Sequence, residues 1–245
     1  MSAVRKAVLL AAGRGSRLGF LTERFPKPML EVGGIPILHR IIDGLASAGV
    51  SQITVVTGHC AEQLEAGTGD GSRWRVRIEY IRQPTPDGTA RAVALARSTV
   101  RDEPFFAGWG DIIVEPANYA RVIEAAGAND AALAVNAVDD PNEGGAVYFD
   151  EASRITRLVE KPPKGTSTTG WNNSGLFVLP PSIWSYIDKL EESPRGEYEL
   201  PQAIASFIAA GNAMTAVPIR GPWFDIGTPA NLEAARAHFR HRVAP

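Results

Sequence analysis

The sequence predicts an α/β protein in which helices cover both faces of a mixed, mainly parallel sheet. The first observation is that apolar runs rich in β-branched residues alternate with amphipathic helical patterns through the first half of the chain. The second is that the opening apolar run leads directly into a loop of small residues. The third is size. The chain has 245 residues, 44% of them hydrophobic, which is enough for a sizeable core. We expect residues 1–245 to form a single domain.

The first half of the chain supplies the predicted parallel part of the sheet. The opening strand lies within residues 6–12, and the second spans residues 52–57. Between them, Pro36 begins an amphipathic helix that Gly49 ends as a C-cap. The remaining elements predicted here are strands at 78–81 and 105–111, the latter ending in Asp111, and helices at about 89–97 and 116–126.

The second half has shorter strands, which predict a mixed extension of the sheet. Strands are expected near residues 131–138, 145–149, 155–160, 173–179 and 214–218, and helices at 183–190 and 200–210. A last helix is predicted for residues 229–242, because Thr228 is a suitable N-cap and Pro229 suits the first helical position. We expect residues 162–170 to form a mobile loop.

The composition excludes several classes of partner. The formal net charge is −2, and no run of Lys and Arg offers the positive surface that attracts nucleic acids or membranes. The apolar run near the N-terminus is too short for a secretory leader or a membrane span. The single cysteine, Cys60, forms no intramolecular disulfide, which fits a cytoplasmic location, and the four histidines lack the spacing of a zinc site. Small-molecule ligands are therefore expected.

The loop after the opening strand is the chief candidate site. Gly13 and Gly15 carry no Cβ atoms, so that backbone N–H groups there can close around an anion. No segment has the P-loop spacing, and the dinucleotide motif G-x-G-x-x-G is incomplete because Leu18 occupies its third glycine position, which disfavours a dehydrogenase. Local positive charge comes from Arg14, Arg17 and Lys27. We expect a polyphosphate ligand, with a mobile loop of solvated arginines as the alternative.

The order of residues in this region is more specific than its glycines. It resembles the signature of the sugar-1-phosphate nucleotidyltransferases, through Gly13-Arg14-Gly15-Ser16-Arg17-Leu18 followed by Pro26-Lys27-Pro28-Met29. The resemblance covers nearly the whole chain and implies a Rossmann-like fold, with a nucleotide-binding part at about 1–130, a sugar-binding part at about 131–228 and a C-terminal helix at about 229–243. The implied reaction joins a nucleoside triphosphate to a sugar 1-phosphate and releases pyrophosphate.

The resemblance implies roles for residues on the nucleotide side. Arg17 and Lys27 match catalytic cations that contact the triphosphate and the α-phosphate, with two surface charges as the alternative. Residues 82–90 resemble the segment that reads the base, and the Gln83 amide offers both a donor and an acceptor to a pyrimidine edge. An ordinary turn is the alternative there. The residues implied for nucleotide binding are Leu10, Ala11, Ala12, Gly13, Arg14, Gly15, Gln83, Gly88 and Thr89.

The resemblance also implies a magnesium site. Asp111 and Asp225 match the two aspartates that hold Mg²⁺ in this family, and carboxylate oxygens are hard ligands suited to that ion. For either aspartate alone, a loop cap is the alternative. That two residues so distant in sequence meet in space is an implication of the resemblance.

Four further residues match the sugar side of the family. Glu160 and Lys161 lie in a Val-Glu-Lys-Pro segment in which the carboxylate accepts from sugar hydroxyls and the ammonium meets the sugar phosphate. Gly145 lets the sugar approach the backbone, and Asn173 hydrogen-bonds a hexose or its acetamido group. A surface ion pair, a hairpin turn and a strand edge are the respective alternatives. Glu199 falls in another family segment, where an exposed carboxylate at a helix start is an equal alternative.

The favoured substrates are dTTP or UTP with glucose 1-phosphate, because residues 69–74 and 83–88 most resemble the thymidylyltransferase branch. A Gly-Thr-Ala sequence where that branch reads Gly-Leu-Ala leaves the base open. The enzymatic alternative is a guanylyl- or cytidylyltransferase acting on another sugar or polyol phosphate. A nucleotide-sugar sensor without catalysis is an alternative of another class, although it has no need of the complete set Arg17, Lys27, Asp111 and Asp225. Dimers and tetramers are common in the family, which leaves a homo-oligomer open.

Overall fold

The computed structural model describes residues 4–127 and 131–240 and contains a nine-stranded mixed sheet. Its parallel strands are β1 (Lys6–Ala11), β4 (Gln52–Thr57), β5 (Arg77–Arg82) and β6 (Phe105–Trp109). Its other strands are β8 (Ala132–Ala137), β9 (Gly145–Phe149), β10 (Ile155–Glu160), β11 (Trp171–Leu179) and β12 (Thr215–Pro218). Two short ribbons pair β2 (Glu31–Val32) with β3 (Ile35–Pro36), and β7 (Ile112–Val114) with β13 (Trp223–Asp225).

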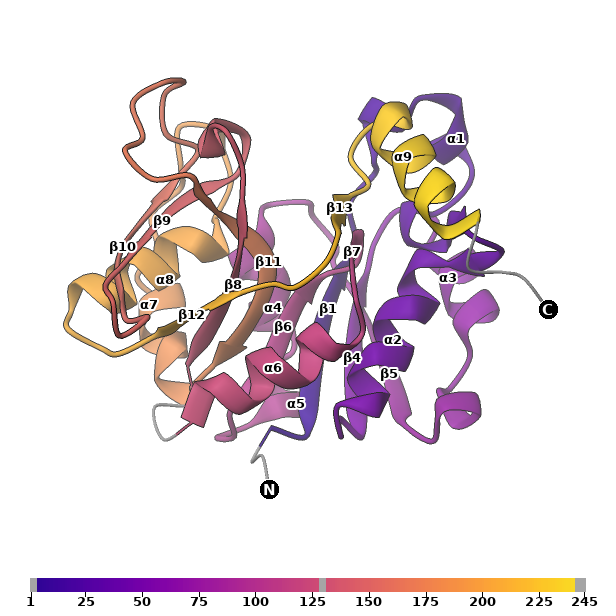
Figure 1. Ribbon diagram of the computed structural model, residues 1–245. Coiled ribbons are helices and arrows are strands. Elements are labelled where there is room, and N and C mark those ends of the chain that lie inside the picture. The colour runs from indigo at the N-terminus through magenta and orange to yellow at the C-terminus, as the bar shows by residue number, and fades with distance from the viewer. Residues whose placement is uncertain (1–3, 128–130, 241–245) are drawn as a thin grey trace.

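Helices link these strands, as Figure 1 shows. In the first half they are α1 (Phe20–Glu23), α2 (Ile37–Ser47), α3 (Ala61–Thr68), α4 (Thr89–Leu95), α5 (Arg97–Val100) and α6 (Ala117–Ala126). In the second half they are α7 (Trp184–Ile187), α8 (Leu200–Ala209) and α9 (Pro229–Arg240). Across residues 4–127 and 131–240, no helix combines the length and the apolar character that crossing a membrane requires.

The parallel strands lie in the order β5-β4-β1-β6. The chain therefore builds outward from β1 on one side and then returns to place β6 on its other side. Loops that leave the carboxyl ends of two such strands run to opposite faces of the sheet, and ligands of α/β proteins bind in the crevice between them. The loop after β1 begins at Ala12, and the loop after β6 contains Asp111.

The antiparallel extension begins at β11, which pairs with β6 on one side. Its other side pairs with β8 near both ends, and Asn172 near its start also pairs with Ala146 of β9. The register of β11 against β8 shifts between Asn173 and Phe177, and Gly175 within this stretch has a φ of 78°. The same strand that continues the parallel sheet carries Asn172 and Asn173 near its start.

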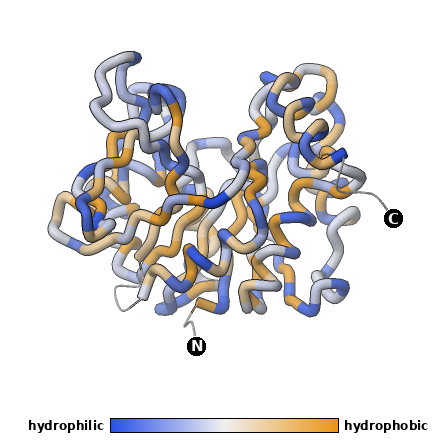
Figure 2. Tube along the Cα trace, in the orientation of Figure 1, coloured by the Kyte–Doolittle hydropathy of each residue, from blue (hydrophilic) through white to orange (hydrophobic). Residues whose placement is uncertain are grey.

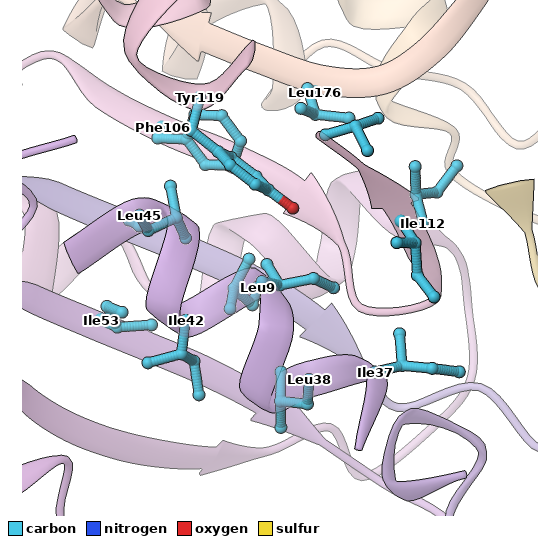
Figure 3. Packing of buried hydrophobic residues seen from close by; sticks show 14 of the residues in the cluster. Leu9, Ile37, Leu38, Ile42, Leu45, Ile53, Phe106, Ile112, Tyr119 and Leu176 are labelled. Atoms are coloured by element: carbon cyan, nitrogen blue, oxygen red, sulfur yellow. The ribbon is translucent and has the colours of Figure 1, made fainter. Parts of the chain in front are cut away.

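Side chains of the sheet alternate between two apolar clusters, one on each face. On β1, residues 7, 9 and 11 belong to the cluster under α2 and α6, whereas Val8 belongs to the cluster under α4, α7 and α8. Hydrophobic residues accordingly follow the strands along their length (Figure 2). Figure 3 shows the first cluster, in which sheet, α2 and α6 meet through Leu9, Phe106, Leu38, Ile42 and Tyr119. Because these strands are buried on both faces, their sequences are nearly continuous runs of apolar residues.

The predicted fold class is confirmed, and the strands at 52–57, 145–149 and 155–160 have the predicted bounds. The helix predicted for about 89–97 instead divides into α4 and α5, because the Thr99 hydroxyl donates to the Ala96 carbonyl (2.8 Å) at the break. Of the helix predicted for 183–190, only α7 is α-helical. The N–H groups of Lys189 and Leu190 donate to carbonyls three residues back, which is the tighter 3₁₀ pattern.

The C-terminal helix is α9 as far as the chain is described, and residues 241–243 of the prediction lie outside the described residues. Thr228 acts as the predicted N-cap, because its hydroxyl accepts from the Asn231 N–H (3.3 Å). Strands β7 and β13 have three residues each, too few for a periodic pattern to reveal them. The sequence reasoning also missed α3.

Phe106→Ala should lower the free energy of unfolding by about 3 to 5 kcal/mol, because Phe106 is fully buried and the smaller side chain leaves a cavity. Urea unfolding followed by circular dichroism measures this loss. Phe20→Ala is the matched control. The Phe20 side chain is 80% exposed, so that its removal should change the same quantity by no more than about 0.5 kcal/mol. Equal losses in the two variants would contradict the described core.

Candidate active site

Two adjoining cavities open at the carboxyl ends of β1 and β6. Their volumes are about 250 Å³ and about 460 Å³. The Gly110 N–H donates to the Leu10 carbonyl (2.8 Å), which ties the ends of the two strands together. Both cavities are lined by Thr89, Trp109, Asp111 and Glu197. Asp111 therefore stands at the border between two spaces that open side by side.

Most residues singled out in the sequence meet around these cavities. Those lining the smaller cavity are Leu10, Ala12, Gly13, Gln83, Gly88, Thr89 and Asp111. Those lining the larger cavity are Arg17, Thr89, Asp111, Glu160, Lys161, Asn173 and Asp225. Ala11, Arg14, Gly15, Lys27 and Gly145 are absent from both linings, as far as the chain is described. Of these, Ala11, Lys27 and Gly145 are buried, Gly15 is half-buried and Arg14 is exposed to solvent.

Lys27 is held rigidly behind Asp111. Its side chain is buried and its ammonium forms an ion pair with the Asp111 carboxylate. A 3₁₀ turn spans Lys27–Met29, and the prolines on either side of the lysine fix two φ angles of that turn. The aliphatic stem packs on Gly15, where a Cβ would lie 3.0 Å from Lys27 Cδ, so that a glycine with its φ of 65° is required there.

Arg17 and Asp225 line the larger cavity together with Asp111, and both lie near Gly227. In the β7–β13 ribbon, Asp225 pairs with Ile112, and the Ile226 N–H donates to the Asp111 carbonyl (3.1 Å). Antiparallel pairing thus brings together two aspartates that are more than a hundred residues apart. The Arg17 guanidinium lies against Gly227, with Nη2 3.0 Å from the position of a Cβ there.

The charges of this group act on one another. Burial and the negative charge of Asp111 raise the pKa of Asp225 above its usual range, and the cations Lys27 and Arg17 oppose that rise. Burial, which disfavours the charged form of the carboxyl group, is the larger of the two causes.

On the side of the smaller cavity, the segment after β5 is locked to the start of α8. Gly88 has a φ of 116°, and a Cβ there would overlap the backbone of Tyr198, with the Tyr198 nitrogen at 2.5 Å. The Thr89 hydroxyl accepts from the Leu200 N–H (2.9 Å), and the Ala90 N–H donates to the Tyr198 carbonyl (2.9 Å). Only glycine permits this approach, which fixes the wall that carries Gln83.

On the side of the larger cavity, a buried amide network supports the strands. The Asn172 side chain accepts from the Gly145 N–H (3.1 Å) and donates to Asn136 Oδ1 (3.1 Å), which also accepts from the Ser174 hydroxyl (3.0 Å). The Gly145 N–H is thereby occupied within the protein. Asn173 lines the cavity, and its Oδ1 accepts from the Gly175 N–H (2.9 Å), which leaves its NH₂ group without a hydrogen-bond partner among the described residues.

Glu160 belongs to a cluster of two carboxylates around one guanidinium. Arg195 forms an ion pair with Glu199, and its Nη2 lies 3.8 Å from Glu160 Oε1. Burial and the charge of Glu199 raise the pKa of Glu160 to about 7, whereas Lys161 and Arg195 oppose the rise. Glu199 is 4% exposed, so it is no exposed helix-start carboxylate, and its Oε2 has no hydrogen-bond partner among the described residues.

The sequence reasoning missed Arg195 and Asn172 as parts of this site, and it noted Trp109 only as a neighbour of predicted site residues. Arg195 lies four residues before Glu199, and that spacing was the one available signal, because an i,i+4 pair of opposite charge often forms an ion pair. Asn172 precedes a predicted residue in a strand, where the next side chain points to the opposite face. Trp109 carried no signal beyond its position beside a predicted strand end.

The donor set at Asp111 and Asp225 fits a small hard cation. Mg²⁺ binds through one or two carboxylates and completes its shell with phosphate oxygens and waters. Two adjacent aspartates, one with a raised pKa, offer that partial set. No cluster of three or more His, Cys, Asp or Glu side chains suited to a metal occurs in the part of the chain that is described. The site therefore has donors for an ion that arrives with a phosphate ligand.

A further cavity, of about 590 Å³, lies at the opposite edge of the sheet, near the amino ends of β1, β4 and β5. It is lined by polar and charged residues that include Arg5, Lys6 and Arg77. The Lys6 ammonium is already bonded to Glu103 (2.6 Å) and to the Val100 carbonyl (3.2 Å). None of the residues predicted for the site lines it.

The fold and the two cavities define an α/β protein with a crevice at the carboxyl ends of β1 and β6 that holds cations and carboxylates. Residues 6–242 match the family model described as nucleotidyl transferase, and the chain belongs to that family. It is 34% identical over 230 residues to the low-salt glycan biosynthesis nucleotidyltransferase Agl11 of Haloferax volcanii, covering 93% of this chain and 64% of the relative. It is 31% identical over 235 residues to the glucose-1-phosphate thymidylyltransferase of Xanthomonas campestris, covering 94% of this chain and 79% of the relative.

A solved structure shares the fold over nearly its full length. It is a Bacillus anthracis protein assigned as a glucose-1-phosphate thymidylyltransferase and crystallised with sucrose. The TM-score is 0.87 at 27% sequence identity, and the match covers 96% of this chain and 95% of that one. The chain spans only 55% to 64% of the length of several curated relatives, archaeal GlmU proteins among them.

Glu160→Gln should change the pH dependence of stability. With a pKa raised from 4.5 to about 7, Glu160 binds its proton more tightly in the folded than in the unfolded chain, so its contribution is present below pH 4.5 and is lost as the pH rises to about 7. The free energy of unfolding is measured by urea titration at pH 4.5 and at pH 7.5. Between these two pH values it should decrease by about 3 kcal/mol more in the wild type than in Glu160→Gln.

Glu151→Gln is the control for this measurement, because Glu151 is exposed. Its stability should follow the wild-type pH curve. Parallel curves for all three proteins would show that Glu160 titrates as an ordinary surface carboxyl group.

Proposed function

We propose that the protein transfers a nucleotidyl group from a nucleoside triphosphate to a sugar 1-phosphate. An oxygen of the sugar phosphate attacks the α-phosphorus, the bond from that phosphorus to the oxygen bridging the β-phosphate breaks, and pyrophosphate leaves. The observation that carries the proposal is Asp111, which borders both cavities while its carboxylate pairs with buried Lys27. Two phosphates, one bound in each cavity, can react only where the two cavities meet, and Asp111 lies at that place.

Arg17 and Lys27 are the cations we assign to the developing charge. Arg17 lines the larger cavity, and Lys27 lies directly behind Asp111, so both are near the place where two phosphates would meet. Fixed positive groups of this kind lower the barrier because they neutralise charge that grows in the transition state and need no reorganisation. Phosphoryl-type transfer asks mainly for such alignment and neutralisation.

The smaller cavity is proposed to take the base and ribose, and the larger cavity the sugar phosphate. Backbone groups from Leu10 to Gly15 then face the triphosphate, although Ala11, Arg14 and Gly15 line neither cavity as described. In the larger cavity, Glu160 and the amide of Asn173 are suited to sugar hydroxyls, and Lys161 to the phosphate. Gly145 contributes by its small size, because its N–H is taken by Asn172.

Mg²⁺ is the proposed cofactor, held by Asp111 and Asp225. The ion would supply charge neutralisation for phosphate oxygens when bound. Binding it would also relieve the repulsion that raises the pKa of Asp225. Both carboxylates line the larger cavity beside each other, which supports a cation in this place.

We favour dTTP or UTP and glucose 1-phosphate as substrates, in agreement with the thymidylyltransferase names of the Xanthomonas relative and the Bacillus structure. The nucleotide and sugar parts are proposed to meet at about residue 130, within the stretch 128–130 that lies outside the described residues. A cytoplasmic location is proposed because nucleoside triphosphates and sugar phosphates are made there.

Lys27→Ala should lower kcat by about 10³-fold, since an interaction made with charge in the transition state is lost. Steady-state assays of pyrophosphate release measure the effect, and thermal melting reports the accompanying loss of stability. Arg24→Ala is the control, because it removes an exposed cation from the same segment. Near-normal turnover of Lys27→Ala would contradict the assignment of Lys27 as a cation that stabilises the transition state.

The direct test of the function is pyrophosphate release in the presence of Mg²⁺ from dTTP, UTP, CTP, GTP and ATP, each crossed with a panel of sugar 1-phosphates. We expect turnover with dTTP or UTP and glucose 1-phosphate, and its loss in Arg17→Ala and Asp111→Ala. Turnover restricted to CTP or GTP would contradict the proposed substrates but support the proposed reaction. Binding of dTTP or UTP without turnover of any pair would contradict the enzymatic proposal and favour a sensor.

A further inference from the structure

We propose that Asp87 is a positioning residue that fixes the side-chain amide of Gln83 in one orientation and thereby selects bases that carry a ring N–H. The inference rests on the proposed function, because it assumes that the smaller cavity holds a nucleotide base. It names the class of base as uracil, thymine or another base with a donor at its ring nitrogen. The residue that makes the choice touches the glutamine and not the base.

Gln83 donates to two acceptors at once. Its Nε2 lies 3.0 Å from Asp87 Oδ1 and 3.3 Å from the Gly88 carbonyl oxygen. A carboxylate and a carbonyl have lone pairs but no protons, so each of them can only accept. The NH₂ end of the amide must therefore face Asp87 and Gly88. The reverse orientation would set the amide oxygen against two other oxygens.

Both partners of this contact stand on fixed backbone. The Gln83 N–H donates to the Thr57 carbonyl at the end of β4 (2.8 Å). The Asp87 N–H donates to the Thr85 carbonyl (2.9 Å), and the Asp87 carbonyl accepts from the Tyr198 N–H (2.9 Å). Because the backbone is held at both ends, the carboxylate cannot follow the amide if it turns. Asp87 thus restricts the side-chain amide of Gln83 to one orientation.

The orientation leaves the amide oxygen free to serve the cavity. Gln83 lines the smaller cavity, and its Oε1 accepts no hydrogen bond from the residues described. The side chain therefore offers an acceptor to a ligand, although an unrestrained glutamine would offer a donor equally well.

An acceptor distinguishes the bases by their ring nitrogens. Uracil and thymine carry N3–H, and guanine carries N1–H, whereas N3 of cytosine and N1 of adenine are themselves acceptors. An acceptor opposite an acceptor leaves both unpaired in a partly buried site, and that is the kind of mismatch by which proteins reject an analogue most strongly. We infer that UTP and dTTP are bound in preference to CTP because Asp87 holds Gln83 as an acceptor.

The test is isothermal titration of UTP and CTP, in Mg²⁺ buffer without sugar phosphate, into the wild type, Asp87→Ala, Asp87→Asn and Thr85→Ala. The wild type should bind UTP at least tenfold more tightly than CTP. In Asp87→Ala the ratio of the two Kd values should move at least tenfold toward unity, because the amide is free to turn over. Asp87→Asn should move the ratio in the same direction by a smaller factor, since its amide can present either its oxygen or its NH₂ group to Gln83.

Thr85→Ala controls for general damage to the loop, because the carbonyl that Asp87 uses belongs to the backbone and survives the change. If Asp87→Ala fails to fold, as judged by its thermal melt, Asp87→Ser takes its place, since a serine hydroxyl is too short to reach the amide. A wild type without preference for UTP, or an alanine variant that keeps the full preference, would overturn the inference.

The outcome is separable from that of the proposed function. If the binding ratio behaves as expected but no pyrophosphate is released with any sugar phosphate, Asp87 keeps its role and the enzymatic proposal fails. If pyrophosphate is released but the Asp87→Ala ratio equals the wild-type ratio, the reaction stands and the orientation of Gln83 is set by something else.

Discussion

The structure depends on one charge contact, the ion pair between buried Lys27 and half-buried Asp111 at the crevice between β1 and β6. An ammonium and a carboxylate lose their hydration when they are buried, and only close, well-oriented pairing offsets that cost. The chain supplies the required precision from separate sources. Two prolines and a glycine hold the lysine, whereas the end of β6 and the β7–β13 ribbon hold the aspartate.

The charges around this contact are nearly balanced but crowded. Two carboxylates and two cations occupy the border of the cavities, and a second group of carboxylates around Arg195 lies on the far side of the larger cavity. Burial, with a neighbouring carboxylate as the second cause, raises the pKa of Asp225 in the first group and of Glu160 in the second. Perturbed pKa values of this kind are typical of functional sites.

The two halves of the sheet contribute in different physical ways. The parallel half contributes loops after β1, β5 and β6, which bring both backbone groups and charged or amide side chains to the cavities. The antiparallel half contributes polar side chains on strands, which are themselves fixed by the amide network of Asn136, Asn172 and Ser174. Backbone groups suit phosphates of any nucleotide, whereas strand side chains suit hydroxyl groups whose positions differ between sugars.

The sequence by itself determined the fold class, most strand positions and the loop residues Arg17 and Lys27, because these follow from local patterns of apolar residues, glycine and proline. It also pointed to Asp111 and Asp225 through their motifs. Only the tertiary structure decided that these two meet, that Lys27 lies behind one of them, and that the Gly145 N–H is already occupied. Short ribbons such as β7 and β13, and partners such as Arg195 and Asp87, follow from contacts made after the chain has folded. Their free energies depend on burial and neighbouring charge, which no local pattern contains.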